Sequence, residues 1–354
     1  MKKRSNRGTR GFQRGVGLIE VLVSIVIAML LVLVIYQIYE VSEGQKRTIT
    51  AGSDATQNAA FGLYTLTRDV AIAGNGITSA AGQLGQCPAL SPDTLSPIPV
   101  EIRAGATDND PDQITVLYGG SSSLATAVPF KQSSAGNTYV VQAPVGFSPK
   151  DVVAAVQGAT CTVATVNGVA VDPATGFSTL TVTPVAGNLA AVYSAVTASV
   201  VNLGPAGSLA SVAYTVDNGA LRTRKLLPTA DAVPMPLVSD VINLKAQYGL
   251  DTNGDGVIDA WHDATGAWTP DAIAALAPTD RLNKIRQIVA VRVAIVTRSS
   301  QYEKDPVTTG PINMFDTTLG GTAVSMTVAT PDTHYRYKVL ETIVPLRNAL
   351  WNPS

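Results

Sequence analysis

The sequence has few charged side chains, and this shortage excludes whole classes of protein. Charged residues make up 14% of the 354 positions and hydrophobic residues 46%. An average soluble domain has roughly 25% charged residues. Disorder driven by charge is therefore excluded. The formal net charge of −1 gives no general argument for nucleic-acid binding, and we expect no such contact. The length fits one large or two ordinary domains and excludes a small scaffold held by disulfides.

Catalytic motifs are nearly absent. The chain has two histidines, His262 and His334, and it has no nucleophile elbow, no zinc-protease motif and no glycine-rich phosphate loop. A hydrolase with a Ser/His/Asp triad around His334 stays open as an alternative, because such triads form in space and not in sequence. His334 precedes a predicted strand and is more simply a surface residue. We therefore predict that the protein is not an enzyme.

Positive charge is concentrated at the N-terminus. Residues 1–15 carry six basic side chains and no acid, which leaves the rest of the chain at −7. Residues 21–39 follow with no charge, proline or glycine, and as a helix they would reach about 30 Å, enough to span a bilayer core. The positive-inside rule places the N-terminus in the cytoplasm and the rest outside, with one crossing. The basic residues are Lys2, Lys3, Arg4, Arg7, Arg10 and Arg14.

Three interpretations compete for this N-terminal segment: a cleaved secretory signal, a plain anchor and a prepilin leader. A secretory signal should have about 7 to 15 apolar residues followed closely by a small-x-small site. Here the apolar run is longer, and the first Ala-x-Ala, residues 71–73, lies far beyond it. A plain anchor gives no reason for the lone acid Glu20 at the margin of the run, where an ionised carboxylate is costly.

The segment Arg14-Gly15-Val16-Gly17-Leu18-Ile19-Glu20 resembles the prepilin signal of type IV pilins. The resemblance implies that a prepilin peptidase cuts between Gly15 and Val16 and that Val16 becomes an N-methylated terminus. Pilins usually begin with phenylalanine, so Val16 departs from the pattern. Glu20 would be fifth in the mature chain. Because an opposite charge stabilises a carboxylate among apolar helices, and a neighbouring subunit's α-amino group supplies one, we predict that Glu20 docks subunits.

A stripe of apolar residues at helical spacing continues beyond the membrane segment, and no proline occurs before Pro88. We predict one spine helix over about residues 17–73, roughly 85 Å long, with glycines as weak points. Residues 16–40 would form its transmembrane half and residues 41–76 its extracytoplasmic half. The stripe is Ala55, Ala59, Leu63, Leu66, Val70 and Ala73, and the glycines are Gly44, Gly52 and Gly62.

After residue 76 the sequence changes to short Val-, Thr- and Ala-rich runs separated by turn residues, which is typical of antiparallel β structure. Asn167-Gly168 and Asn218-Gly219 predict hairpin turns. Residues 285–298 and 335–347 are further strand candidates. The predicted fold class is α+β, with the long N-terminal spine helix packed on a mainly antiparallel β-rich domain at residues 77–354.

Four later stretches resemble PilW-type minor pilins. The resemblance implies a low-abundance subunit that helps other minor pilins and the major pilin to prime a type IV pilus on an inner-membrane assembly platform. It implies a place at the fibre tip beneath a large adhesin, a periplasmic C-terminal domain before assembly, and the cell surface afterwards. Residues 88–235 show no resemblance that we can place. The four stretches are residues 58–76 around Arg68-Asp69, 237–259, 288–299 and 341–348.

Two other function classes stay open. A pseudopilin of a type II secretion system has the same leader and spine but is usually shorter. A membrane-anchored extracytoplasmic enzyme would keep its N-terminus intact.

One short motif carries metal chemistry. Residues 251–259 reproduce the first nine positions of a calcium loop, in which four side chains and one backbone carbonyl supply oxygen ligands. These would come from Asp251, Asn253, Asp255 and Asp259, with the carbonyl from Val257. His262 replaces the usual glutamate at position 12, and nitrogen suits Ca²⁺ poorly, so Asp263 would complete the site from a shifted loop exit. The alternative is an Asx-rich turn without metal.

Cys87 and Cys161 are the two cysteines. Outside the cytoplasm a disulfide between them is favoured over free thiols. Closing this loop would stabilise the fold by about 4 to 5 kcal/mol in the chain-entropy model. The alternative is two buried thiols too far apart to pair.

Overall fold

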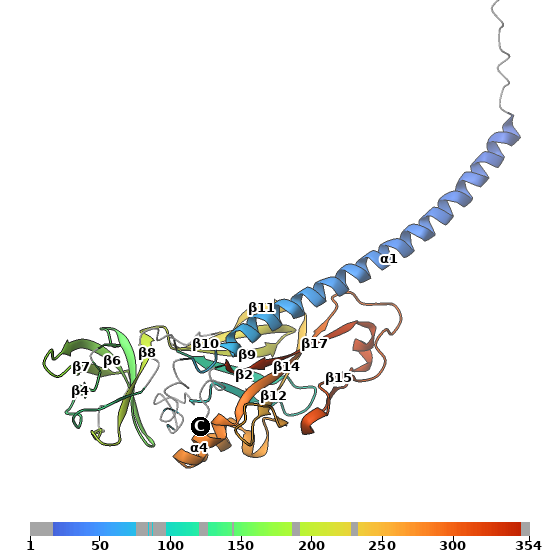
Figure 1. The fold of residues 1–354 in the computed structure, drawn as a ribbon. Coiled ribbons are helices and arrows are strands. Elements are labelled where there is room, and N and C mark those ends of the chain that lie inside the picture. The colour runs from blue at the N-terminus through green and yellow to red at the C-terminus, as the bar shows by residue number, and fades with distance from the viewer. Residues whose placement is uncertain are drawn as a thin grey trace, which may run out of the picture. The chain divides into compact units, whose positions relative to one another are not determined.

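The structure is a computed structural model that describes residues 17–75, 84, 87, 97–119, 127–143, 145–185, 192–227 and 233–347. The chain divides into two compact units, Met1–Ala51 and Gly52–Ser354, and each is described by itself. Helix α1, Leu18–Ala71, begins in the first unit and ends in the second (Figure 1). The predicted spine helix is confirmed to within two residues at its C-terminal end.

Helix α1 runs through Gly44, Gly52 and Gly62 without a break. A mid-helix glycine costs about 1 kcal/mol, which a long helix can absorb. Gly62 has a packing reason as well. A Cβ atom there would lie 3.1 Å from the Leu221 side chain, so its absence lets the helix approach the sheet closely.

The apolar stripe of the second unit is buried as predicted. Ala55, Ala59, Leu66 and Val70 are each at most 2% exposed, and the stripe packs on the main core of the domain. The helix ends where Gly74 adopts a left-handed backbone, φ 72°, and donates its N–H to the carbonyl of Leu117 at 2.8 Å. The period of the stripe thus fixes which face of the helix meets the sheets.

A five-stranded antiparallel sheet, in the order β1-β2-β9-β10-β11, forms one part of this core. The hairpin predicted at Asn218-Gly219 is confirmed, because both residues have positive φ, 51° and 70°, and join β9 to β10. The strands are β1 (Val100–Arg103), β2 (Gln113–Tyr118), β9 (Ala210–Asp217), β10 (Ala220–Leu227) and β11 (Met235–Ser239).

A four-stranded antiparallel sheet, in the order β13-β12-β14-β17, forms the other part. Both predicted C-terminal strands are confirmed as β14 (Ile288–Arg298) and β17 (Tyr337–Pro345), and they pair with β12 (Val241–Leu250) and β13 (Ala260–Asp263). A small sheet of β15 (Ile312–Met314) and β16 (Val324–Met326) covers part of its other face. The short helices are η1 (Gly266–Trp268), α3 (Pro270–Ala275), α4 (Pro278–Arg286), η2 (Thr318–Gly320) and η3 (Thr330–His334).

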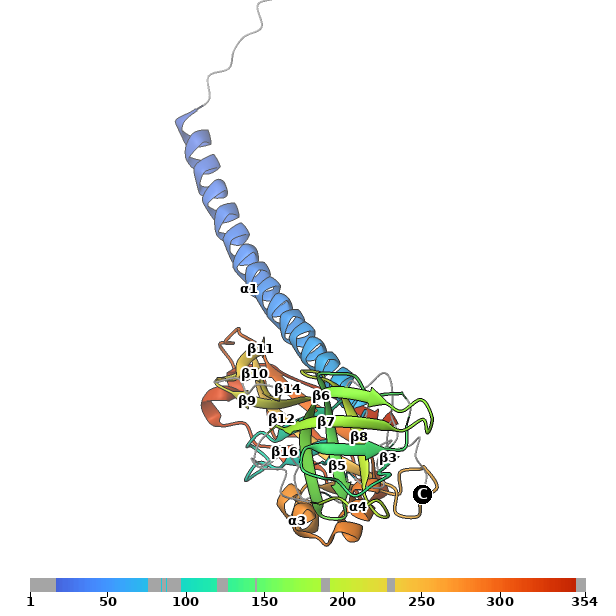
Figure 2. The same cartoon turned by 90° about the vertical axis from the view of Figure 1, so that its left-hand side faces the viewer.

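A six-stranded antiparallel sheet, β3-β8-β5-β6-β7-β4, has a hydrophobic cluster of its own (Figures 1 and 2). Phe130, Tyr139 and Tyr193 form the aromatic centre of this cluster, with ring centroids 5.2 to 6.0 Å apart. We call residues 127–205 the inserted sheet. Its strands are β3 (Val128–Pro129), β4 (Thr138–Val141), β5 (Asp151–Gln157), β6 (Thr160–Val171), β7 (Ser178–Pro184) and β8 (Ser199–Pro205).

The hairpin predicted at Asn167-Gly168 is wrong. Both residues lie inside β6, where the pairing with β7 shifts between Val166 and Gly168. Asn167 is the extra residue of this bulge, and its side-chain amide donates to the Thr183 hydroxyl at 2.6 Å. The chain reverses instead at residues 172–177. The fold class, α+β with a long N-terminal helix and a mainly antiparallel β domain, is confirmed.

Candidate assembly site

The N-terminal end of α1 carries the predicted docking acid. Glu20 lies in the first turn, and its backbone N–H donates to the carbonyl of Gly17 at 2.9 Å. The side chain is exposed, and no ion pair to it occurs among the residues that the structure describes. An acid at this end also interacts favourably with the helix dipole. The predicted cleavage residues Gly15 and Val16 lie outside the described residues.

The membrane half of α1 exposes apolar side chains on every side. An 18-residue window of this helix has a mean hydropathy of 3.2 with none of it buried, and its length and composition suffice to cross a membrane. Large residues from Leu18 to Val41 are 45 to 82% exposed. Such a surface needs lipid or other apolar helices to cover it.

A buried carboxylate ties the second half of the helix to the sheet. Asp69 is 5% exposed and accepts a hydrogen bond from the Tyr214 hydroxyl on β9 at 2.6 Å. Arg68 donates to the same carboxylate at 3.1 Å. Burial, followed by the bond to Asp69, raises the pKa of Tyr214, so the phenol stays protonated as the donor. The Arg68-Asp69 pair had pointed to the family, but its structural role was not predicted.

The predicted calcium loop brings three of its oxygen-bearing side chains together. The Asn253 side-chain amide lies 3.2 Å from a carboxylate oxygen of Asp255 and 3.4 Å from one of Asp259. Asp251 accepts backbone N–H groups of residues 253, 254 and 256 with its two oxygens. Hydrogen bonds from Thr252 lower the pKa of Asp259. The loop thus holds Asn253, Asp255 and Asp259 near one another through hydrogen bonds, and Asp251 is already well bonded.

The structure places Asp263 three residue pairs along the β12–β13 ladder from the base of the loop. The chain leaves the loop as strand β13 and not as a helix, and Asp263 lies opposite Gln247, three residues along β12 from Leu250. Its carboxylate accepts the Gln247 amide at 2.6 Å. His262 pairs with Tyr248 in the same ladder. Among the described residues, no group of three or more His, Cys, Asp or Glu side chains is arranged to hold a metal.

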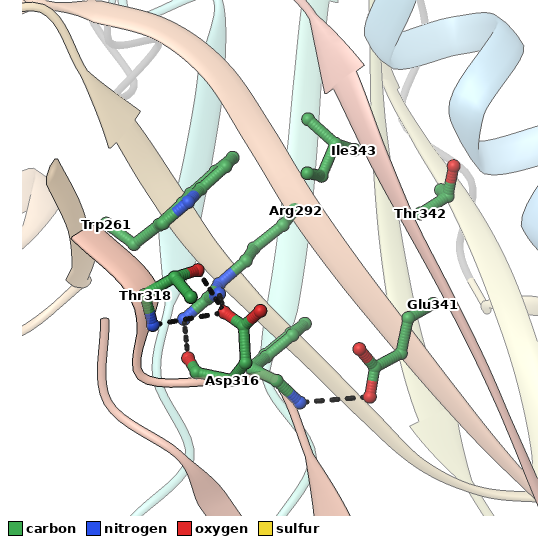
Figure 3. Close-up of a pocket in the computed structure, with 8 residues that line it drawn as sticks. Trp261, Arg292, Asp316, Thr318, Glu341, Thr342 and Ile343 are labelled. Carbon is green, nitrogen blue, oxygen red and sulfur yellow. Dashed lines mark hydrogen bonds and ion pairs between the residues drawn. The ribbon is translucent and has the colours of Figure 1, made fainter. Parts of the chain in front are cut away.

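A pocket of about 330 Å³ lies on the four-stranded sheet beside Arg292 (Figure 3). The Arg292 side chain is 5% exposed, and it donates to Gln247 at 2.6 Å and to the Asp316 carboxylate at 3.1 Å. Its guanidinium lies 4.9 Å from the Trp261 ring and 4.7 Å from the Phe315 ring. Gly249 has no Cβ, and this leaves room for Trp261. Arg292 is therefore fully engaged by its own chain, and it organises the pocket wall.

His334 contacts Glu303 and Tyr302. Its Nδ1 lies 2.8 Å from the carbonyl of Glu303, and its ring stacks on Tyr302 at 4.7 Å. It ends the short helix η3 just before β17. Its side chain is half-buried, so the prediction of a surface residue is met only in part.

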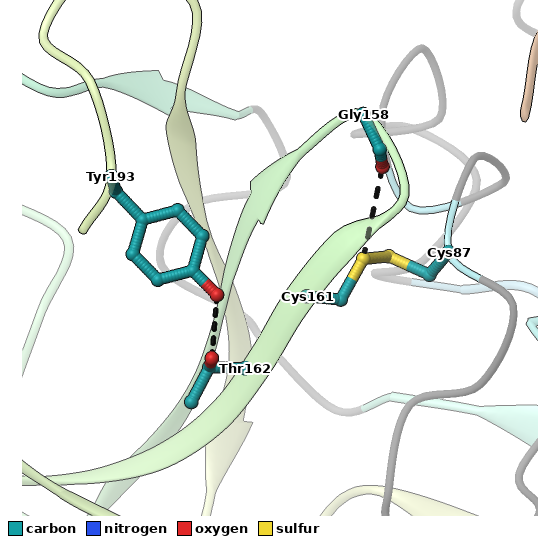
Figure 4. The surroundings of a disulfide bond; sticks show 5 residues. All are labelled: Cys87, Gly158, Cys161, Thr162 and Tyr193. Carbon is teal, nitrogen blue, oxygen red and sulfur yellow. Dashed lines mark hydrogen bonds between the residues drawn. A yellow bond between two sulfur atoms is a disulfide. The ribbon is translucent and has the colours of Figure 1, made fainter. Parts of the chain in front are cut away.

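Cys87 and Cys161 form a disulfide in the structure (Figure 4). Their Cα atoms lie 5.9 Å apart across 74 positions of sequence. Cys87 is fully buried and Cys161 lies on β6, opposite Val156. The bond therefore fastens Cys87 to the inserted sheet.

The comparisons with known proteins bear on these features. Residues 210–348 match the family model for Type IV Pilus-assembly protein W, and residues 10–36 match the Prokaryotic N-terminal methylation motif. These two matches support a PilW-type minor pilin of the type IV pilus. A solved structure, a type IV-like pilin from Thermus thermophilus, matches at 13% identity and a TM-score of 0.23, over 41% of this chain and 70% of that one. A search of curated proteins finds no match.

The PilW match covers the strands of the four-stranded sheet and the pocket beside Arg292. It begins at β9 and runs past β17, so it includes the calcium-like loop and Arg292. The inserted sheet and the disulfide lie outside it. Sequence reasoning missed Arg292 as a site residue, although a single arginine inside the apolar run of residues 288–296 was a signal that it is buried and paired.

Removing the disulfide should destabilise the pilin. In Cys87→Ala with Cys161→Ala, the free energy of unfolding should fall by about 4 kcal/mol, because the unfolded chain regains the entropy of a long loop. Urea unfolding of the full-length chain in detergent, followed by tryptophan emission, measures this difference. Reductant should destabilise the parent by a similar amount and leave the double variant unchanged. Equal stability of parent and variant would contradict the prediction.

Proposed function

We propose that this minor pilin helps to prime assembly of a type IV pilus and remains at the fibre tip. One chain combines a prepilin motif at residues 10–36 with a PilW region at residues 210–348, and this combination supports the proposal. The exposed apolar helix supplies the part that enters a bundle of pilin helices. The inserted sheet adds bulk outside the family region, which is easier to accommodate at an end of a fibre than along it.

The proposed life cycle has two locations. The uncleaved chain sits in the inner membrane with its C-terminal domain in the periplasm. A prepilin peptidase cuts the leader at the cytoplasmic side of this membrane, and Val16 is then methylated. The partners are the other minor pilins, the major pilin, the assembly platform and a large tip adhesin. The family description favours a pilus over a secretion pseudopilus. A pilin is a structural protein, and we assign it no enzymatic activity.

Deletion and labelling test the proposal together. A strain without this chain should carry at least tenfold fewer surface pili, and the full-length chain should restore them. Gold label on an epitope in the restored chain should mark one end of each fibre. Normal pilus numbers in the deletion strain would contradict the priming role, and label spread along the fibres would contradict the tip position.

We also propose that the loop of residues 251–259 binds Ca²⁺ weakly. Four side chains and one carbonyl leave the site short of the usual six to eight ligands, so water must complete it. The dissociation constant should be on the order of 10⁻⁴ to 10⁻³ M, as in extracellular modules. Buried Trp261, two residues past Asp259, reports on the loop.

Titration of Ca²⁺ into the full-length chain should change tryptophan emission and raise the melting temperature. Asp251→Ala with Asp255→Ala should abolish both responses. Asp263→Asn is the matched control, because Asp263 lies outside the loop, and it should respond like the parent. An unchanged spectrum and melting temperature up to about 10 mM would reduce the motif to a turn.

A further inference from the structure

Strand β17 is an unusually long open edge. Sheets usually end in short strands, because an unpaired row of N–H and C=O groups invites another strand to pair with it. The other edge strands that the structure describes have two to five residues, whereas β17 has nine. Its pairing with β14 is regular throughout, with no bulge to twist the edge away.

The register shows which backbone groups of β17 face outward. The Leu346 N–H donates to the Val289 carbonyl, and the Ser299 N–H donates to the Arg336 carbonyl, each at 2.8 Å. Both pairs continue the register in which β14 and β17 are paired. Bonded and unbonded pairs alternate in an antiparallel ladder. The backbone groups of Val339, Glu341 and Ile343 therefore point away from β14. Among the described residues, none of these three N–H groups has a hydrogen-bond partner.

A groove of about 620 Å³ runs between this edge and the end of α1. Its helix side includes Tyr64, Arg68 and Ile72, and its strand side includes residues 342–345 and Arg347. Tyr64 is 66% exposed and Ile343 is 56% exposed, so apolar surface borders the open backbone. Figure 3 shows Ile343 and Glu341 on the pocket side of β17 and Thr342 toward the helix.

The charges of the groove favour an acidic occupant. The Arg68 side chain is 63% exposed and is paired with buried Asp69. Arg347 is exposed, and no ion pair to it occurs within the described part of the chain. The groove thus carries one surplus positive charge beside its apolar surface.

We propose that the β17 edge binds an extended segment of another pilin subunit as an added strand. The outward N–H and C=O groups would pair with the backbone of that segment, and an acidic side chain on it would face Arg68 and Arg347. Pairing through the backbone gives affinity, and the groove selects the side chains. That the partner is a pilin rests on the proposed assembly role.

Proline at an outward position tests the edge with little harm to the fold. Pro345 already occupies such a position, since it pairs with Ala290 in the unbonded phase of the ladder. Ile343→Pro removes one outward N–H group and places a ring in the path of an added strand. Ile343→Val keeps the N–H group and the branched side chain, and it is the matched control.

The full-length chain is co-expressed with one candidate partner at a time, either the major pilin or one of the other minor pilins of the same fibre. Each pair is then purified in detergent. At least one pilin should co-purify with the parent and with Ile343→Val, and about tenfold less of it should co-purify with Ile343→Pro. Arg347→Glu should weaken retention more than Arg347→Lys. Equal retention by Ile343→Pro and the parent would overturn the proposal.

Hydrogen exchange on the unmodified chain gives a second test that does not depend on the variant's folding. Amides in residues 337–345 should exchange more slowly in the complex than in the free chain. A complex with no added protection would overturn the strand docking and leave the assembly role intact. Protection already present in the free chain, and lost on deleting residues 348–354, would show that the chain's own end fills the edge. If no pilin co-purifies even with the parent, the assembly role fails as well.

Discussion

Glu20→Gln should yield a cleaved, membrane-inserted pilin that is incorporated into fibres at least tenfold less than the parent. The substitution keeps the size of the side chain and removes its charge. If the carboxylate pairs with a neighbouring subunit's α-amino group among apolar helices, its loss leaves that charge unpaired, which costs about 3 to 5 kcal/mol. A difference of about 1.4 kcal/mol changes an equilibrium constant tenfold, so a cost of this size should lower incorporation by more than tenfold. Immunoblots of sheared fibres and of membranes measure the ratio.

Glu40→Gln is the matched control for this experiment. Glu40 is an exposed acid on the same helix, beyond the apolar run, and its replacement changes the charge equally. This variant should enter fibres like the parent. Normal incorporation of Glu20→Gln would show that Glu20 is incidental, as would equal losses for both variants.

Gly15→Asp should block processing. The prepilin signal places a small residue immediately before the cut, and a charged side chain there should slow cleavage by about 100-fold or more, equivalent to roughly 2.7 kcal/mol in the barrier. The full 354-residue chain should then accumulate in the membrane. Gel mobility and intact mass distinguish it from the processed form.

Gly11→Asp is the control, because it adds the same charge to the same basic leader four residues before Gly15. It should be cleaved at nearly the parent's rate. Slow cleavage of both variants would mean that leader charge, and not the size of residue 15, decides processing. Normal cleavage of Gly15→Asp would place the cut elsewhere.

The sequence predicts those parts of the fold whose signal is local. The stripe from Ala55 to Ala73 has one period over several turns, so it specifies both the helix and its buried face. Asn218-Gly219 predicts its hairpin because each residue tolerates a positive φ at a place where two strands meet. The strands β14 and β17 are long and rich in branched residues.

The errors arise where a local motif depends on what lies across from it. Asn167-Gly168 has the composition of a turn, but β7 pairs with β6 on both sides of it, and the pair becomes a bulge. The calcium template assumes a helix after the loop, and here the chain continues as β13, which takes Asp263 to Gln247. Neither partner strand can be read from the motif itself.

The candidate site divides in the same way. Glu20 can be singled out because an isolated acid beside a long apolar run is conspicuous in sequence, and its docking role stays a prediction. The open edge of β17 is not, because edge and centre strands can share a composition and differ only in their neighbours. The role of Asp69 likewise depends on Tyr214, which lies 145 positions away.

The mass of the N-terminal peptide from this chain in purified pili tests the central claim most directly. The account predicts that the chain is present in the fibres, that its first residue is Val16, and that this residue carries one methyl group on its amine. Recovery of chain that still begins with residues 1–15, or its absence from fibres when it is abundant in membranes, would contradict the account.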